Sequence, residues 1–205
     1  MGNCNKKPKG TRQSKPGNDL NVRGHTALPT KLQAKIVLIG DQNVGKTSIA
    51  ERYSSGAPIF SPKATVGACY SEKTVQFADS SEILLRIWDT AGHEKFRAHS
   101  ALYYQKAHAA IITYSVIDAN SFKSIDYWLK QLDDHIDINK IVIYIVGNKN
   151  DVHRDERQIT FQEGQKEAVK KKFRFFETSA IAENSTVNDI FDNIAKDIHS
   201  NFERS

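Results

Sequence analysis

The sequence has few cysteines and no long apolar run, and each shortage excludes a class of protein. Only Cys4 and Cys69 occur among its 205 residues, too few for the disulfide framework of a small secreted domain. No stretch approaches the ~20 consecutive apolar residues that cross a bilayer. The N-terminus lacks the apolar segment of a secretory signal peptide. We therefore expect an intracellular protein, with enough apolar residues (39%) to form a core.

Proline and charge are distributed unevenly along the chain. All five prolines lie at or before Pro62. Residues 1–31 carry seven cations and one anion, whereas residues 32–205 carry 22 cations and 23 anions. The first segment has no apolar period, so we expect a flexible basic arm at 1–31 and one folded domain at 32–205. Such an arm can contact nucleic acid or an anionic membrane, or it can be a solvated tail.

Apolar runs and helical periods alternate from residue 34 onward. The runs predict strands at 34–39, 69–78, 83–88, 109–116, 141–146 and 173–177. The periodic segments predict helices at 48–53, 94–105, 120–134, 161–172 and 185–202. This alternation is typical of an α/β fold with a mostly parallel sheet of six strands flanked by helices. In such sheets, ligands bind beyond the carboxyl ends of the strands.

The most specific motif is the segment Gly40–Thr47, which fits GxxxxGK[ST] between a predicted strand and a predicted helix. In this motif the backbone N–H groups face phosphate oxygens, Lys46 adds a positive charge, and the hydroxyl of Thr47 ligates Mg²⁺. The positive end of the following helix faces the same anion. The residues predicted to hold the phosphates are Gln42, Asn43, Val44, Gly45, Lys46, Thr47 and Ser48.

Three further polar segments follow predicted strands. Asp89 can hold the Mg²⁺ shell, and Gly92 lets the backbone approach a γ-phosphate. In the segment 148–151, the carboxylate of Asp151 can accept hydrogen bonds from two N–H groups of guanine, a pattern that adenine lacks. A backbone N–H in the segment 178–180 can meet the guanine carbonyl. Taken singly, each segment is more typical of a helix cap or a turn. Their order along the chain, each after a predicted strand, favours one site.

Together these motifs resemble the small Ras-like GTPases, and within them the Rab family. The resemblance rests on GDQNVGKT at 40–47, TVG at 65–67, WDTAG at 88–92, NKND at 148–151 and ETSA at 177–180. TVGA at 65–68 looks most like the early-endosomal Rab subgroup. The resemblance implies the small G-protein fold of the P-loop NTPases. It also implies a switch between GDP and GTP forms that regulates vesicle trafficking.

The resemblance also implies roles for individual residues. Mg²⁺ is held by Thr47, Thr65 and Asp89, and hydrolysis of GTP involves Lys46, Gly92 and the residue at position 93. The residues implied at the guanine end are Asn148, Lys149, Asp151, Ser179, Ala180 and Ile181. Exchange factors, GTPase-activating proteins and effectors are expected to contact the switch regions, residues 58–70 and 92–106. The protein is expected to be a monomer.

Four positions depart from the family pattern near the nucleotide. His93 stands where the family has a glutamine that orients the attacking water, and Gln42 stands where the family has a small residue. Both predict slow intrinsic hydrolysis; a hydrolysis-deficient, GTP-loaded binding module is the alternative. Pro58 occupies the position of the aromatic residue that flanks guanine, with Phe60 two residues on, and Ile181 replaces a lysine.

The expected membrane anchor is at the N-terminus. Rab proteins usually end in prenylated cysteines, whereas this sequence ends without one. Gly2 and Cys4 resemble a start for N-myristoylation and palmitoylation, although Lys6 departs from its consensus; an accidental Gly2 is the alternative. The layout resembles N-acylated Rabs of plants and protists, and it predicts a lipid-anchored protein on the cytoplasmic face of endosomal or plasma membranes.

A P-loop enzyme acting on nucleic acid is the second alternative, suggested by the basic arm. The guanine-specific pattern at 148–151 and the absence of a basic stripe in residues 32–205 argue against it. We therefore expect no nucleic-acid partner.

Overall fold

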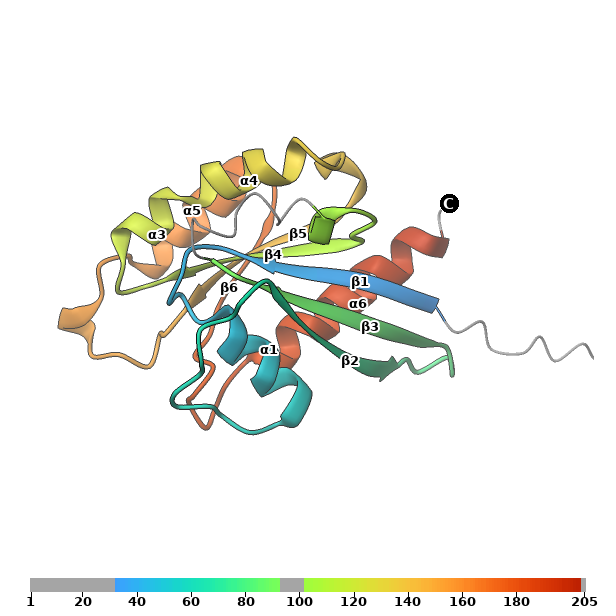
Figure 1. The fold of residues 1–205 in the computed structure, drawn as a ribbon, viewed down its shortest axis with the longest axis horizontal. Coiled ribbons are helices and arrows are strands. Elements are labelled where there is room, and N and C mark those ends of the chain that lie inside the picture. The colour runs from blue at the N-terminus through green and yellow to red at the C-terminus, as the bar shows by residue number, and fades with distance from the viewer. Residues whose placement is uncertain (1–31, 93–101, 204–205) are drawn as a thin grey trace, which may run out of the picture.

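A single twisted sheet organises the chain, as Figure 1 shows for the computed structural model, which describes residues 32–92 and 102–203. The strands are β1 (Leu32–Ile39), β2 (Ala68–Gln76), β3 (Glu82–Thr90), β4 (Ala109–Ser115), β5 (Val142–Asn148) and β6 (Arg174–Glu177). Their order is β2-β3-β1-β4-β5-β6. Only β2 and β3 pair antiparallel, and every other neighbouring pair is parallel. The predicted six-stranded, mostly parallel sheet is therefore confirmed.

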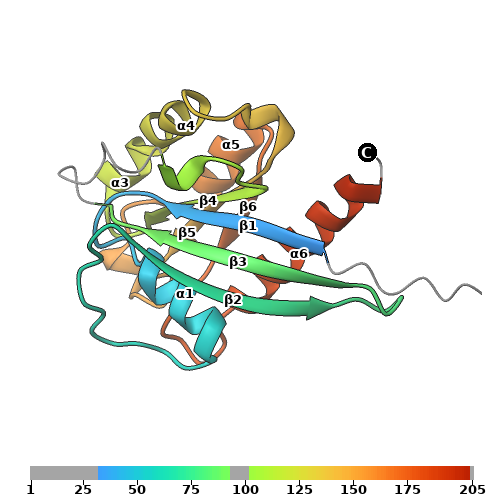
Figure 2. The same cartoon turned by 45° about the vertical axis from the view of Figure 1, so that its right-hand side comes forward.

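Helices cover both faces of this sheet. They are α1 (Lys46–Ser55), α3 (Ala119–Lys123), α4 (Ile125–Asp133), α5 (Phe161–Lys171) and α6 (Val187–Glu203), with short 3-10 turns η2 (Ile138–Lys140) and η3 (Arg154–Glu156). Helices α1 and α6 lie on one face, and α3, α4 and α5 lie on the other (Figures 1 and 2). No helix in the described part of the chain is long and apolar enough to cross a membrane.

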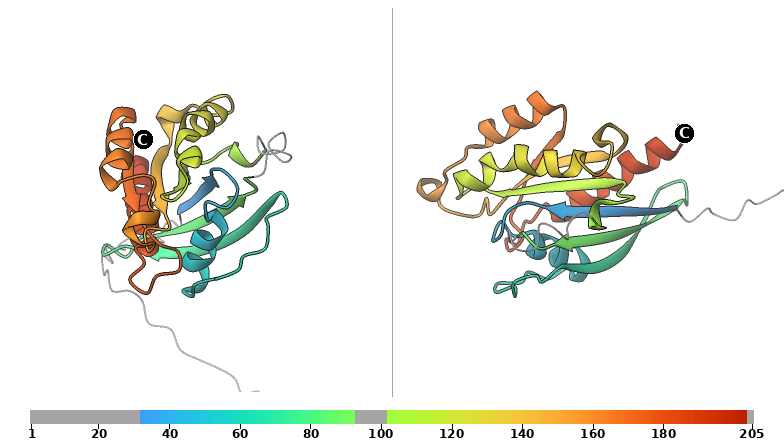
Figure 3. Two further views of the ribbon diagram at one scale, coloured as in Figure 1. Left: turned by 90° about the vertical axis from the view of Figure 1, so that its left-hand side faces the viewer. Right: turned by 45° about the horizontal axis from the view of Figure 1, so that its top comes forward.

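Both faces of the central strands are buried, which explains their unbroken apolar sequences. In β1, the side chains of Ile36 and Leu38 pack on the face of α1 and α6, whereas Val37 and Ile39 pack on the opposite face. The two cores thus alternate along the strand with a period of two. They fix the carboxyl ends of β1, β3, β4 and β5 at one edge of the sheet, where the polar loops begin (Figure 3).

The prediction of one continuous helix at 120–134 is wrong, because the structure divides this segment into α3 and α4 at Ser124. Ser124 has φ of −74° and ψ of −6°, the latter far from the helical value. Its hydroxyl donates to the carbonyl oxygen of Asn120 at 3.0 Å, and such a bond to the preceding turn bends helices. Most of the helix predicted at 94–105 lies outside the described residues, and 102–104 are helical.

His108, directly before β4, is hydrogen-bonded to β1, and this hydrogen bond predicts that stability depends on pH. Its Nδ1 accepts a hydrogen bond from the backbone N–H of Lys35 at 3.0 Å, which only the neutral ring can do. Burial lowers the pKa of His108, and the charge of Lys35 lowers it further. Because the unfolded chain takes up this proton more readily, we expect the free energy of unfolding to fall as the pH drops below about 6.5.

A His108→Asn variant tests this expectation, because its amide oxygen can accept the same bond without titrating. Urea unfolding of the variant should depend less on pH between about pH 5 and pH 7.5 than that of the wild type. His153→Asn, at an exposed site, is the matched control for loss of an imidazole. Equal pH dependence in wild type and His108→Asn would contradict the assignment.

Candidate functional site

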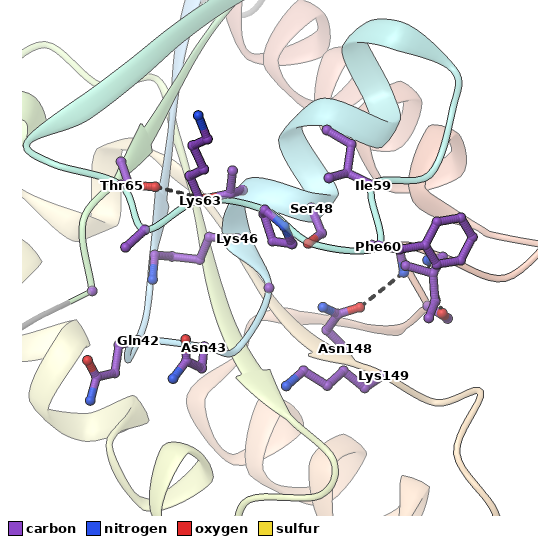
Figure 4. Close-up of a pocket in the computed structure, with 18 of the residues that line it drawn as sticks. Gln42, Asn43, Lys46, Ser48, Ile59, Phe60, Lys63, Thr65, Asn148 and Lys149 are labelled. Atoms are coloured by element: carbon purple, nitrogen blue, oxygen red, sulfur yellow. Dashed lines mark hydrogen bonds between the residues drawn. The ribbon is translucent and has the colours of Figure 1, made fainter.

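The loops that follow β1, β3, β5 and β6 meet at one cavity of about 660 Å³ (Figure 4). The sequence predicted these loops as one site, and the structure brings them together. Every predicted nucleotide-binding residue except Val44 lines the cavity. The three predicted residues His93, Gly2 and Cys4 lie outside the described residues.

The end of the cavity that is predicted to hold phosphates is formed by the loop between β1 and α1, residues 40–45 (the phosphate loop). Helix α1 begins at Lys46, so its N-terminal N–H groups face the cavity, as an anion requires. The side chain of Lys46 is buried, and its Nζ donates to the carbonyl oxygens of Gly40 at 2.9 Å and of Asp41 at 2.8 Å. Burial lowers the pKa of Lys46 to about 8, against the opposing effects of Asp89 and Asp41. A bound phosphate would favour the ammonium form that burial disfavours.

Three oxygen-bearing side chains converge beside this lysine. Thr47 Oγ1 donates to Asp89 Oδ2 at 2.6 Å and lies 2.9 Å from Thr65 Oγ1, which lies 3.3 Å from the same carboxylate oxygen. Asp89 is 2% exposed, and burial raises its pKa, although the hydroxyls and Lys46 act in the opposite direction. Its other oxygen, Oδ1, is buried without a hydrogen bond from any described residue.

This donor set fits Mg²⁺. Hydroxyl and carboxylate oxygens are the ligands that Mg²⁺ prefers, and the ion usually keeps only one or two protein carboxylates while phosphate oxygens supply further positions. Oδ1 of Asp89 accepts no hydrogen bond from the described residues, so it has a lone pair that a bound cation can use. The structure thus brings Thr47, Thr65 and Asp89 together, and their role as metal ligands stays a prediction.

The end of the cavity that is predicted to hold the base is organised by Asn148. This buried side chain donates from Nδ2 to the carbonyl oxygen of Val44 at 2.8 Å and accepts at Oδ1 from the N–H of Ala180 at 3.2 Å. It therefore ties the phosphate loop to the loop after β6. Val44, which does not line the cavity, contributes to it through this bond. Asp151, three residues on, is exposed and lines the cavity, so its carboxylate is free to meet a base.

The loop after β6 is held by its own hydrogen bonds. Ser179 Oγ accepts from the N–H groups of Ile181 at 3.2 Å and of Ala182 at 3.1 Å. Ala180, in the segment predicted to meet a guanine carbonyl, donates its N–H to Asn148. The loop thus enters the site as a preformed turn.

Residues 59, 60 and 62–66 also line the cavity, and the sequence assigned most of this segment only to partner binding. Ile59, Phe60 and Lys63 belong to it. Figure 4 shows Phe60 at the Asn148 end of the cavity, away from Gln42. Pro58, at the family position of the flanking aromatic, is not among the lining residues. The two-residue shift from Pro58 to Phe60 was visible in the sequence, but Ile59 and Lys63 belong to no motif and carried no signal.

Comparison with known proteins agrees with this arrangement. The Ras family profile matches residues 35–200. Mouse Ras-related protein Rab-17 is 38% identical over 173 residues, which cover 84% of this chain and 79% of that protein. Ras-related protein RABE1d of Arabidopsis thaliana is 39% identical over 166 residues, covering 80% of this chain and 74% of that protein. The members of this family are GTPases that bind guanine nucleotides, generally with Mg²⁺. The chain belongs to the Ras family and is a Rab small GTPase.

Proposed function

We propose that the cavity binds GTP and GDP with Mg²⁺ and that the protein is a membrane-tethered switch in vesicle trafficking. The observation that carries the proposal is the convergence of Thr47, Thr65 and Asp89 beside the buried ammonium of Lys46. In this assignment Lys46 and the backbone N–H groups of the phosphate loop hold the phosphates, and Asp151 reads guanine. The metal, when bound, neutralises charge that develops on the phosphates during hydrolysis.

Nucleotide selectivity tests this proposal. We expect the full-length protein to bind fluorescent GDP at least ~100-fold more tightly than fluorescent ADP, because a carboxylate discriminates through hydrogen bonds to two N–H groups of guanine. We also expect EDTA to accelerate GDP release, because the oxygen ligands lose their cation. Equal affinity for the two nucleotides would overturn the assignment of Asp151 and favour the alternative of an enzyme acting on other P-loop substrates.

Slow intrinsic hydrolysis is part of the proposal. Gln42 is exposed and lines the phosphate end of the cavity, where a long side chain can crowd the γ-phosphate. His93 replaces the glutamine whose amide orients the attacking water; an imidazole is shorter and titrates near neutral pH. An activating protein that supplies its own arginine, worth ~10³–10⁵ in rate, would still permit turnover.

A His93→Gln variant should hydrolyse GTP roughly tenfold faster than wild type in single-turnover measurements, because an amide restores the orientation of the water. Gln42→Ala is the companion variant, and the double variant should be fastest. A His93→Gln rate no higher than wild type would contradict the role of residue 93. Failure of a cell extract to stimulate hydrolysis by the wild type would favour the alternative of a GTP-loaded binding module.

The partner surface is proposed on residues 58–70 and 92–106, as in the family. Among the described residues of these segments, Val66 is 76% exposed and Leu102 is 67% exposed, and Tyr70 is about half exposed. Tyr70 also packs edge-on against Trp88 at 5.3 Å between ring centroids. An apolar surface of this kind suits exchange factors, activators and effectors.

Membrane attachment is proposed through Gly2, Cys4 and the basic arm. The arm enters the domain at Leu32, the end of β1 that lies opposite the phosphate loop (Figure 2). The nucleotide cavity begins at the other end of this strand, so attachment through the arm does not cover it. One acyl chain binds only marginally, so a second chain at Cys4 or the cations of the arm are needed for stable attachment.

A Gly2→Ala variant with a C-terminal fluorescent tag is expected to move from membranes to the cytosol, because removal of the acyl acceptor leaves only the weak attraction of the arm. Cys4→Ser should give a partial shift. Membrane fractionation and imaging measure the change, and Asn3→Ala controls for alteration of the N-terminus. Retention of both variants on membranes would refute the proposed anchor.

A further inference from the structure

A buried tryptophan outside the cavity is bonded to its phosphate loop. The indole Nε1 of Trp128, in α4, donates a hydrogen bond of 2.9 Å to Oδ1 of Asp41. Trp128 is 1% exposed and belongs to the core between the sheet and α4 and α5. Asp41 is the first variable residue of the GxxxxGK[ST] segment. The bond therefore connects a rigid core side chain to a loop that the proposed function assigns to phosphate binding.

Asp41 is a negative charge beside a cavity proposed for a polyphosphate. Its backbone carbonyl accepts a hydrogen bond from Lys46 Nζ at 2.8 Å, and its carboxylate lies near enough to raise the pKa of that lysine. If this carboxylate turned toward Lys46, it would compete with a phosphate for the ammonium group and repel the phosphate oxygens. The direction in which Asp41 points therefore matters for nucleotide affinity.

Asp41 is also packed against Gly92, the second residue after β3. A methyl group added at Gly92 would lie 2.5 Å from the carbonyl carbon of Asp41 and 2.4 Å from Lys46 Nζ. The backbone of Gly92, at which the predicted second switch region begins, thus contacts the phosphate loop at Asp41. The backbone of Asp41 is therefore in contact with both Lys46 and Gly92.

We propose that Trp128 is a positioning residue for the nucleotide site: its indole N–H holds the carboxylate of Asp41 toward α4, which leaves Lys46 available to the phosphates. The proposal rests on the proposed nucleotide binding of this cavity. Trp128 does not line the cavity, and its effect passes through Asp41. A hydrogen bond to a charged acceptor, here in a partly buried site, is of the stronger kind.

Release of fluorescent GDP from the full-length protein in Mg²⁺ tests the proposal with four forms: wild type, Trp128→Phe, Asp41→Asn and the double variant. Trp128→Phe keeps an aromatic ring and removes the N–H, so we expect release about tenfold faster, the equivalent of one charge-assisted hydrogen bond. Asp41→Asn keeps an acceptor without the charge and should release GDP no faster than wild type. In the double variant the misplaced charge is gone, so release should return to within about threefold of wild type.

Ile125→Val, in the same helix and core, controls for a loss of packing and should lower the melting temperature without changing release. Two outcomes would overturn the proposal. In the first, Trp128→Phe accelerates GDP release by the same factor whether residue 41 is Asp or Asn, which would mean that Trp128 acts only through packing. In the second, Trp128→Phe releases GDP at the wild-type rate. Failure of the wild type itself to bind guanine nucleotide would instead overturn the proposed function, so the two failures are distinguishable.

Discussion

Gly40→Ala is expected to prevent stable folding, with a loss of about 4 kcal/mol or more in the free energy of unfolding. A Cβ at Gly40 would lie 2.2 Å from the carbonyl oxygen of Thr113, a backbone atom of the neighbouring strand β4. The φ of Gly40 is +141°, which L side chains rarely adopt. Relief of the contact requires separation of β1 from β4 at the edge where the phosphate loop begins, and the buried core on both faces resists that movement.

Gly56→Ala is the matched control. Gly56 also has a positive φ, +76°, but an added Cβ there meets no atom within 4 Å. It should therefore show only the cost of the left-handed conformation, about 1 kcal/mol, or a decrease of about 2–4 °C in the melting temperature. Circular dichroism melts and the soluble yield of the two variants measure the difference. Similar melting temperatures for Gly40→Ala and Gly56→Ala would mean that the close approach to Thr113 does not require glycine at position 40.

The sheet and most of the cavity were predictable from the sequence because their signals are local. Strands buried on both faces appear as apolar runs, and the GxxxxGK[ST] spacing specifies a loop between a strand and a helix. In a parallel sheet the carboxyl ends of strands meet at one edge, so the order of the polar segments was enough to bring Thr47, Asp89 and Asn148 together.

The remaining features depend on contacts between residues that are distant in sequence. The bond from Asn148 to Val44 spans 104 residues, and the bond from Trp128 to Asp41 spans 87. A single sequence carries no signal for such pairs, because each partner alone is an ordinary core or loop residue. The break at Ser124 has a similar origin, since a serine inside a periodic segment gives no indication of whether its hydroxyl will bond to the preceding turn.

Asn148→Asp is expected to weaken GDP binding by at least ~100-fold and to destabilise the fold by about 3 kcal/mol or more. The change is nearly isosteric and keeps an oxygen that can accept from the N–H of Ala180. In the wild type, Nδ2 of Asn148 donates to the carbonyl oxygen of Val44 at 2.8 Å, and the variant puts a carboxylate oxygen in place of this donor. At a site 2% exposed, this places an unpaired negative charge against a carbonyl and separates the phosphate loop from the loop after β6.

The opposite exchange is made three residues along the chain, in Asp151→Asn. Comparing the two variants separates the structural role of Asn148 from recognition of the base by Asp151. Asp151 is exposed, so its variant should unfold at the same urea concentration as wild type while losing ~100-fold of its preference for GDP over ADP. Asn148→Asp should instead lose affinity and stability together. Titration with fluorescent nucleotides and urea unfolding of both variants decide the matter. Wild-type stability in Asn148→Asp would show that the two loops are held by other contacts, whereas unchanged selectivity in Asp151→Asn would place guanine recognition elsewhere in the cavity.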